Sequence, residues 1–221
     1  MAVDASPQRG GEVHDLTASH LAKTATLHER SLADGFFAQL GRRFLREYHR
    51  TFVDSPHALA LGVSSNGQLE GFLLAVLAPQ AHGAYVLRRR GLALGVRGAL
   101  ALSSRPAVLV LFVRTRAGRY ARGLWRRRRK PEVQAVSAPA GEWAVLSHVA
   151  IDDEVRRGGR GALLVRALHD RASAAGAAGV VLVTDPDGPG PGFYRRLGYD
   201  DGTSGVGSDG RQWMRFRYRL R

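Results

Sequence analysis

The chain has 221 residues, enough for a buried core, and its 44% hydrophobic and 24% charged residues are typical of globular proteins. It contains no cysteine, which excludes disulfides, zinc–thiolate sites and a cysteine nucleophile. No uncharged apolar run reaches the roughly 18 residues needed to cross a bilayer. Residues 1–11 lack the apolar segment of a signal peptide, so we expect a disordered N-terminus and a cytoplasmic protein.

The net charge of +14 is concentrated in one segment. Between Glu70 and Glu132 there is no acidic residue, whereas the rest of the chain carries as many acidic as basic residues. Basic side chains gather at residues 88–130, including the run Arg126–Lys130. Arginine runs most often form a solvated face. Because these residues are confined to one segment without acids, binding of an anionic acceptor, nucleic acid or an anionic surface is an equally good interpretation.

The first part of the chain predicts a strand, two helices and a β-hairpin. Residues 12–16 read as a short strand, and apolar residues at helical spacing predict amphipathic helices over 17–33 and 36–52. Two alternating apolar segments then flank Asn66-Gly67, a pair that favours the tight turn of a hairpin.

Residues 79–135 form the basic segment and predict two amphipathic helices. Gly91, Gly95 and Gly98 weaken the first, and the stretch AVLVLFV after Pro106 fits a helix or a strand. Apolar residues alternate with arginines, so we expect each helix to pack its apolar face and to turn its cationic face outward.

The last third predicts a β–α–β unit followed by a short helix and closing strands. Strands are expected at 143–151 and 178–184 with a helix at 162–176 between them, a short helix from Phe193, and an alternating strand at 211–220.

The stretch Arg156–Gly161, RRGGRG, lies between the first of these strands and the helix. A helix N-terminus presents unpaired N–H groups and a positive dipole end, glycines allow close backbone approach, and arginines add charge. The stretch itself matches neither GxxxxGK[ST] nor GxGxxG, so a nucleotide P-loop or a Rossmann turn is unsupported at this position. The stretch predicts a phosphate or pyrophosphate site.

Two motifs in this order resemble those of the GNAT superfamily, the coenzyme A-dependent N-acetyltransferases. R-x-x-G-x-G occurs at Arg156–Gly161, and FYRRLGY follows at Phe193–Tyr199 on the helix after the next strand. The resemblance implies an α/β fold with a central, mostly antiparallel sheet flanked by helices. It also implies a single domain over 1–221 in which 79–135 is a helical insertion between the third and fourth strands.

The resemblance further implies site residues for acetyl-CoA as co-substrate. Backbone groups of Val149, Ala150 and Ile151 would bind the pantetheine arm, and Asp187 lies where many relatives carry a cofactor-contacting Asn. The pyrophosphate would be held by Arg156, Arg157, Gly158, Gly159, Arg160 and Gly161. Tyr194 would be the general acid for the departing thiolate, since a phenol has a pKa of about 10. No metal is expected.

The base that deprotonates the acceptor amine stays open. Glutamates that serve two branches of the family are replaced here by Val145 and Leu182. The candidates are His148, Glu142, Asp185 or water. The predicted function is acetyl transfer from acetyl-CoA to a primary amine of an amino sugar, a small natural product, a peptide or a protein. The alternative is a degenerate acetyltransferase fold that binds nucleic acid or membrane through its basic segment.

Overall fold

The computed structural model describes residues 11–113, 142–207 and 210–220. Its strands are β1 (Glu12–Asp15), β2 (Ala58–Ser65), β3 (Gln68–Val76), β4 (Trp143–Ile151), β5 (Gly179–Thr184), β6 (Asp200–Val206) and β7 (Gln212–Arg219). Its α-helices are α1 (Leu21–Ser31), α2 (Arg42–Val53), α3 (Pro79–Ser103), α4 (Pro106–Phe112), α6 (Arg160–Ala174) and α7 (Gly190–Arg196). Short 3₁₀ turns are η1 (Ala18–His20), η2 (Ala38–Leu40) and η4 (Asp153–Val155).

The seven strands form one sheet in the order β1-β2-β3-β4-β5-β7-β6, in which every neighbouring pair except β4–β5 is antiparallel. The expected mostly antiparallel sheet flanked by helices is confirmed. The predicted hairpin is also correct, because Asn66 and Gly67 both have positive φ angles, 50° and 73°, as a two-residue type I′ turn requires. Strand β6, with the sequence DDGTSGV, was not predicted individually because it lacks apolar alternation.

Both N-terminal helices begin later than the sequence predicts. Residues 18–20 form a 3₁₀ turn before α1, and the Thr17 backbone N–H donates to His20 Nδ1 at 3.0 Å. The second helix starts at Arg42 because Gly41, with φ of 81°, interrupts the helical path after η2.

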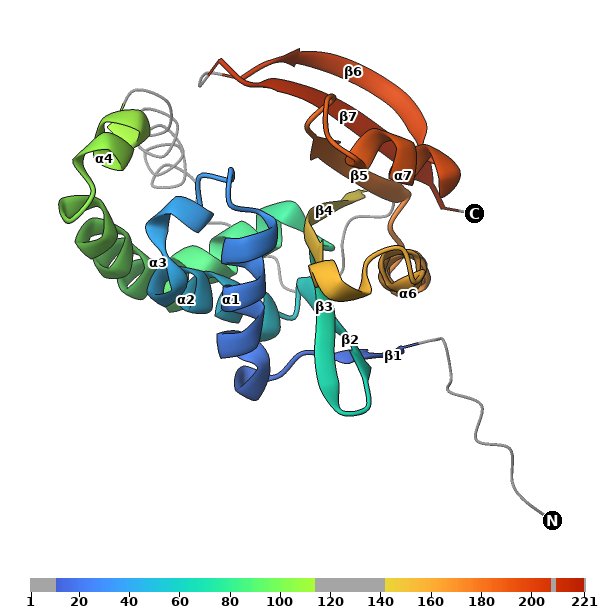
Figure 1. The fold of residues 1–221 in the computed structure, drawn as a ribbon, viewed down its shortest axis with the longest axis horizontal. Coiled ribbons are helices and arrows are strands. Elements are labelled where there is room, and N and C mark those ends of the chain that lie inside the picture. The colour runs from blue at the N-terminus through green and yellow to red at the C-terminus, as the bar shows by residue number, and fades with distance from the viewer. Residues whose placement is uncertain (1–10, 114–141, 208–209, 221) are drawn as a thin grey trace.

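Helices cover both faces of the sheet (Figure 1). On one face, Leu164, Val165 and Leu168 of α6 belong to a core cluster with Val180 of β5 and Phe216 of β7. The opposite face of β2–β4 is covered by α1 and α2. There Leu27, Phe52, Phe72, Leu74 and Ala150 form the second cluster.

Strands β4 and β5 pair over three residues only and then separate. Trp143, Ala144 and Val145 pair with Gly179–Val181, whereas β4 continues along β3 to Ile151. The β3–β4 register shifts between Leu74 and Ala75, which leaves Ser147 as an extra residue on β4. Beyond Val145, the edge of β4 that faces β5 has no partner strand in the described part of the chain.

The described part of segment 79–135 is helical, as expected, and the stretch after Pro106 is helix α4. Helix α3 runs through Gly91, Gly95 and Gly98 without a break. It packs on α2, where Arg90 and Arg97 bind the mostly buried Glu47 at 3.4 and 3.5 Å and Arg90 also pairs with Asp54.

The expected division into a packed apolar face and an outward cationic face is met only in part, because apolar residues of α3 are exposed as well. Leu92, Val96 and Leu100 of α3 are 84%, 51% and 66% exposed. Two arginines instead turn toward the acidic residues of α2, because a buried carboxylate needs a counter-charge. The run Arg126–Lys130, like residues 1–10, lies outside the described residues.

Candidate functional site

The RRGGRG stretch forms the turn between η4 and α6. Gly159 is the N-cap of α6 and has a left-handed backbone, with φ of 78°. Arg157 also has a positive φ, 65°, which is uncommon for a residue with a side chain. Two left-handed residues so close together turn the backbone sharply, and α6 therefore begins inside the motif, at Arg160.

This turn leaves a row of backbone donors unused. The N–H of Leu163 donates to Gly159 O at 3.1 Å and begins the helical ladder. Within the described part of the chain, the N–H groups of residues 157–162 donate to no protein acceptor. Consecutive free N–H groups at the positive end of a 15-residue helix are suited to bind an anion.

The three arginines of the motif lie in different surroundings. Arg160 is only 16% exposed and forms an ion pair with Glu70 of β3, so its guanidinium anchors the turn to the sheet. Arg156 is more exposed and pairs with Asp153 at 2.6 Å. Arg157 is exposed and forms no ion pair among the described residues. Of the three, Arg157 is the one whose charge is open to a ligand.

The second motif lies directly against the first. Residues 193–196 belong to α7, and Phe193 packs so closely on α6 that a Cβ atom at Gly161 would lie 3.2 Å from its ring. The Tyr194 ring is 5% exposed and contacts Phe193, Tyr199 and Phe216 at centroid distances of 5.0, 5.4 and 6.0 Å.

Burial raises the pKa of Tyr194, so its phenol remains protonated at neutral pH. No hydrogen bond of its hydroxyl to another described residue is present. The group can therefore donate its proton to a ligand.

The residues predicted to contact the pantetheine arm lie on the free edge of β4. Val149, Ala150 and Ile151 follow the point at which β5 has diverged, although all three remain paired with β3. Side chains of Val149 and Ile151 pack toward α6, and Ala150 is buried on the α1–α2 side. Unpaired backbone groups on such an edge can hydrogen-bond an extended ligand, as in strand addition.

His148 lies on the α1–α2 side of β4. Its Nε2 is 2.9 Å from the Tyr48 hydroxyl, and its ring centroid is 4.7 Å from that of His28. Desolvation, with a smaller contribution from His28, lowers the pKa of His148 to about 3. With this lowered pKa, the His148 ring is neutral throughout the physiological range.

The other predicted polar residues lie elsewhere. Glu142 is partly buried and precedes the first residue of β4. Asp185 and Asp187 are exposed in the turn after β5, where Asp185 Oδ1 accepts a hydrogen bond from the Asp187 backbone N–H at 2.9 Å. Asp185 thus stabilises this turn, and the Asp187 carboxylate is open to solvent.

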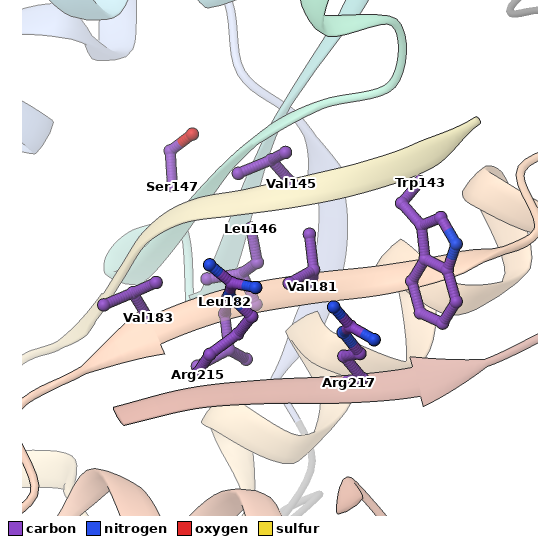
Figure 2. Close-up of a pocket in the computed structure, with 9 residues that line it drawn as sticks. All are labelled: Trp143, Val145, Leu146, Ser147, Val181, Leu182, Val183, Arg215 and Arg217. Carbon is purple, nitrogen blue, oxygen red and sulfur yellow. The ribbon is translucent and has the colours of Figure 1, made fainter. Parts of the chain in front are cut away.

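An open pocket of about 570 Å³ lies where β4 and β5 diverge (Figure 2). It is lined by Trp143, Val145, Leu146, Ser147, Val181, Leu182, Val183, Arg215 and Arg217. The sequence analysis recognised the alternation of residues 211–220 but assigned no function to its arginines. The missed signal was charge at every second position of a strand whose other residues are apolar, which places Arg215 and Arg217 together on one face.

The sequence and fold were compared with known proteins. The family model described as FR47-like protein, a GNAT-related family, matches residues 123–204. A comparison with curated proteins gives no match.

Several solved structures share the fold. Ard1 from Thermoplasma volcanium is 12% identical, with a TM-score of 0.57 over 96% of this chain and 99% of that protein. An aminoglycoside 6′-N-acetyltransferase complexed with coenzyme A is 11% identical, with a TM-score of 0.57 over 94% of this chain and 96% of that protein. Arabidopsis thaliana NAA60 in complex with acetyl-CoA is 12% identical, with a TM-score of 0.55 over 95% of this chain and 98% of that protein.

The chain therefore has the fold of the GNAT superfamily, and the resemblance carried by its two motifs is confirmed. The described helices include none that is both long and apolar enough to span a membrane. Over the same residues, no group of three or more His, Cys, Asp or Glu side chains is arranged so that it could hold a metal ion.

Proposed function

We propose that the protein is an N-acetyltransferase that moves an acetyl group from acetyl-CoA to a primary amine. The observation that carries this proposal is the turn at 157–162, whose free N–H groups lie at the start of α6, next to the unpaired edge of β4. Two of the structural relatives are complexes with coenzyme A and acetyl-CoA, which supports the same ligand here.

The residues of the turn fit a pyrophosphate. Gly159 has open space around it, with no heavy atom within 4 Å of a Cβ built there, so an anion can approach its backbone. The free N–H groups of residues 157–162 and the open charge of Arg157 supply donors and positive potential. The absence of a partner strand along β4 after Val145, among the described residues, supports the proposal that backbone groups of Val149–Ile151 hold an extended chain that continues from the turn.

Acetyl-CoA, when bound, supplies the acetyl group as a thioester. The acceptor nitrogen forms a bond to the acetyl carbon, and the carbon–sulfur bond breaks. We propose that a backbone N–H on the β4 edge, at Val149, stabilises the carbonyl oxygen. Tyr194 gives its proton to the departing sulfur, and its buried, neutral phenol suits an acid that must hold the proton until then.

The amine must lose a proton before or during the transfer. Above about pH 4 His148 is a neutral imidazole with one ring N–H, and with a pKa of about 3 it is only a weak base. Neither carboxylate is favoured as the base. Asp185 accepts a hydrogen bond from the Asp187 backbone N–H, and Glu142 precedes the first residue of β4. We therefore favour deprotonation through water over any of these three side chains, with neutral His148 able to accept a hydrogen bond from that water.

The alternative is a degenerate acetyltransferase fold that binds polyanions through residues 88–130. The intact turn and the retained Tyr194 favour the enzyme. A thermal shift measured with CoA and, separately, with DNA or anionic vesicles distinguishes the two. Stabilisation by CoA supports the enzyme, and stabilisation by the polyanions alone supports the binding module.

The test of activity is release of free CoA thiol from acetyl-CoA in the presence of a panel of primary amines. The panel should contain amino sugars, small amines, peptides and a basic protein. Amine-dependent thiol release with a matching acetylated product supports the proposal. A protein that binds CoA and transfers acetyl to none of them would contradict it.

A further inference from the structure

The pocket at the divergence of β4 and β5 combines apolar walls with two cations. Arg215 and Arg217 are alternate residues of β7, opposite Val183 and Val181 of β5, so all four side chains lie on one face of the sheet. Val145 of β4 lies opposite Val181 and extends this face. Figure 2 shows the Arg215 guanidinium directed across β5 toward β4, and the Arg217 guanidinium directed toward β5 beside the Trp143 ring.

The two guanidinium groups have no counter-charge in the described part of the chain. Neither arginine forms an ion pair or a hydrogen bond with another described residue. Asp200 stands opposite Arg217 on β6, yet the Arg217 guanidinium lies 5.9 Å from the centroid of the Trp143 ring instead. The neighbouring carboxylate, Asp201, is bound to Arg195 at 2.8 Å.

The apolar walls of the pocket are also incompletely covered. Val183 is 58% exposed, although its backbone is paired with Arg215 of β7. The Trp143 indole and Val181 line the same wall. A ligand with an apolar skeleton would remove this surface from water, which stabilises the bound state in proportion to the area covered.

We propose that this pocket binds an acceptor that carries an oxyanion, a carboxylate or a phosphate, on an apolar skeleton in addition to its primary amine. A guanidinium binds either oxyanion through two parallel N–H donors. Residues two apart on a strand are about 7 Å apart, so one oxyanion can engage one or both arginines. Because the proposal rests on the proposed function, its test must separate acceptor recognition from CoA binding.

The test compares wild-type protein with the double variant Arg215→Gln/Arg217→Gln. Acceptors are used in matched sets in which a primary amine carries a carboxylate, a phosphate or a neutral amide at the same position. The control variant is Lys23→Gln/Arg166→Gln, which removes two exposed charges outside the pocket. Initial rates give kcat/KM for every acceptor, and calorimetry gives the affinity for CoA.

Wild-type protein and the control should prefer an oxyanion-bearing acceptor to its amide. In the double variant this preference should fall by about ten- to a hundredfold, as expected for the loss of charge-assisted hydrogen bonds, while CoA affinity stays unchanged. The carboxylate and phosphate members of each set decide which oxyanion is used. Equal kcat/KM for charged and neutral acceptors in wild-type protein would overturn the inference and leave acetyl transfer standing. If the wild-type protein does not bind CoA, the proposed function itself is contradicted.

Discussion

Gly161 lies directly against the ring of Phe193, and a Cβ atom at Gly161 would be 3.2 Å from Phe193 Cζ. This contact joins the start of α6 to α7, so the two sequence motifs form one structural unit. The glycine is needed for packing rather than for a special backbone conformation, because its φ is not positive.

We predict that Gly161→Val destabilises the protein by about 1–3 kcal/mol, the usual cost of overpacking a close contact. The matched control is Gly95→Val in the interior of α3, where a Cβ would meet no atom within 4 Å. Urea denaturation of the two variants measures the difference. A Gly161→Val variant no less stable than Gly95→Val would show that α6 and α7 can separate without cost.

Tyr194→Phe should fold normally, because the substitution removes only a hydroxyl from a ring that packs on Phe193 and Phe216. Loss of the proton donor should lower kcat by roughly 10²–10⁴-fold with little change in CoA affinity. Steady-state kinetics with the best acceptor checks this. A kcat equal to that of the wild type would leave Tyr194 with a packing role alone.

The arginines of the turn should separate into two roles. Arg157→Asn keeps a residue that tolerates positive φ and removes the open charge, so CoA affinity should fall about three- to tenfold with stability unchanged. Glu70→Gln removes the partner of the mostly buried Arg160 and should lower the free energy of unfolding by about 1–3 kcal/mol.

For each variant, calorimetry gives the affinity for CoA, and urea denaturation gives the free energy of unfolding. If Glu70→Gln is as stable as the wild type, Arg160 does not anchor the turn. If Arg157→Asn binds CoA as tightly as the wild type does, the charge of Arg157 faces solvent only.

A cluster of three histidines, the buried His28 and His49 and the half-buried His148, should make the fold sensitive to acid. Thr24 donates its hydroxyl to Leu21 O, so His49 Nδ1–H must donate to Thr24 Oγ1, and His28 Nδ1–H must then donate to His49 Nε2 at 2.9 Å. This chain of hydrogen bonds requires a neutral His49, because its Nε2 must accept the bond from His28. Desolvation lowers the pKa of His28 to about 4 and of His148 to about 3, and it lowers the pKa of His49 well below its usual value.

The folded protein favours the neutral rings, whereas the unfolded chain binds protons with a pKa of about 6.5. The fold is therefore most stable above pH 6.5, and its free energy of unfolding decreases as the pH falls toward 4. The lowered pKa of His28 alone should reduce the free energy of unfolding by about 2 kcal/mol between pH 7 and pH 5. Urea denaturation at pH 7, 6 and 5 should give this decline, and His28→Gln should reduce its slope. A free energy of unfolding that is constant over this range would contradict the assigned protonation.

The order of strands and helices could be predicted from the sequence because its signals are local. Apolar periodicity, the Asn66-Gly67 pair and the RRGGRG turn each depend on a few neighbouring residues. The sharp turn before α6 was also predictable, since glycines such as Gly159 allow the left-handed backbone that such a turn needs.

Features that depend on distant residues were not predictable. The partner of Arg160 is Glu70, ninety residues away, and the lowered pKa of His148 comes from burial beside α1 and α2. The outward leucines of α3 follow from the acidic residues of α2, which draw Arg90 and Arg97 inward. The pocket itself exists because β4 and β5 diverge after Val145, and no residue pattern marks that point.

The most direct test of the account is the affinity for CoA of the variant Gly159→Glu, measured by calorimetry. Its control is Gly176→Glu at the other end of α6, because both glycines have nearly the same φ, 78° and 77°, and neither has an atom within 4 Å of an added Cβ. Backbone strain is therefore matched, and only Gly159→Glu places a carboxylate in the anion site. We predict that Gly159→Glu loses CoA affinity by at least about tenfold, whereas Gly176→Glu binds as the wild type does. Equal CoA affinity in both folded variants would contradict the assignment of this turn as the pyrophosphate site.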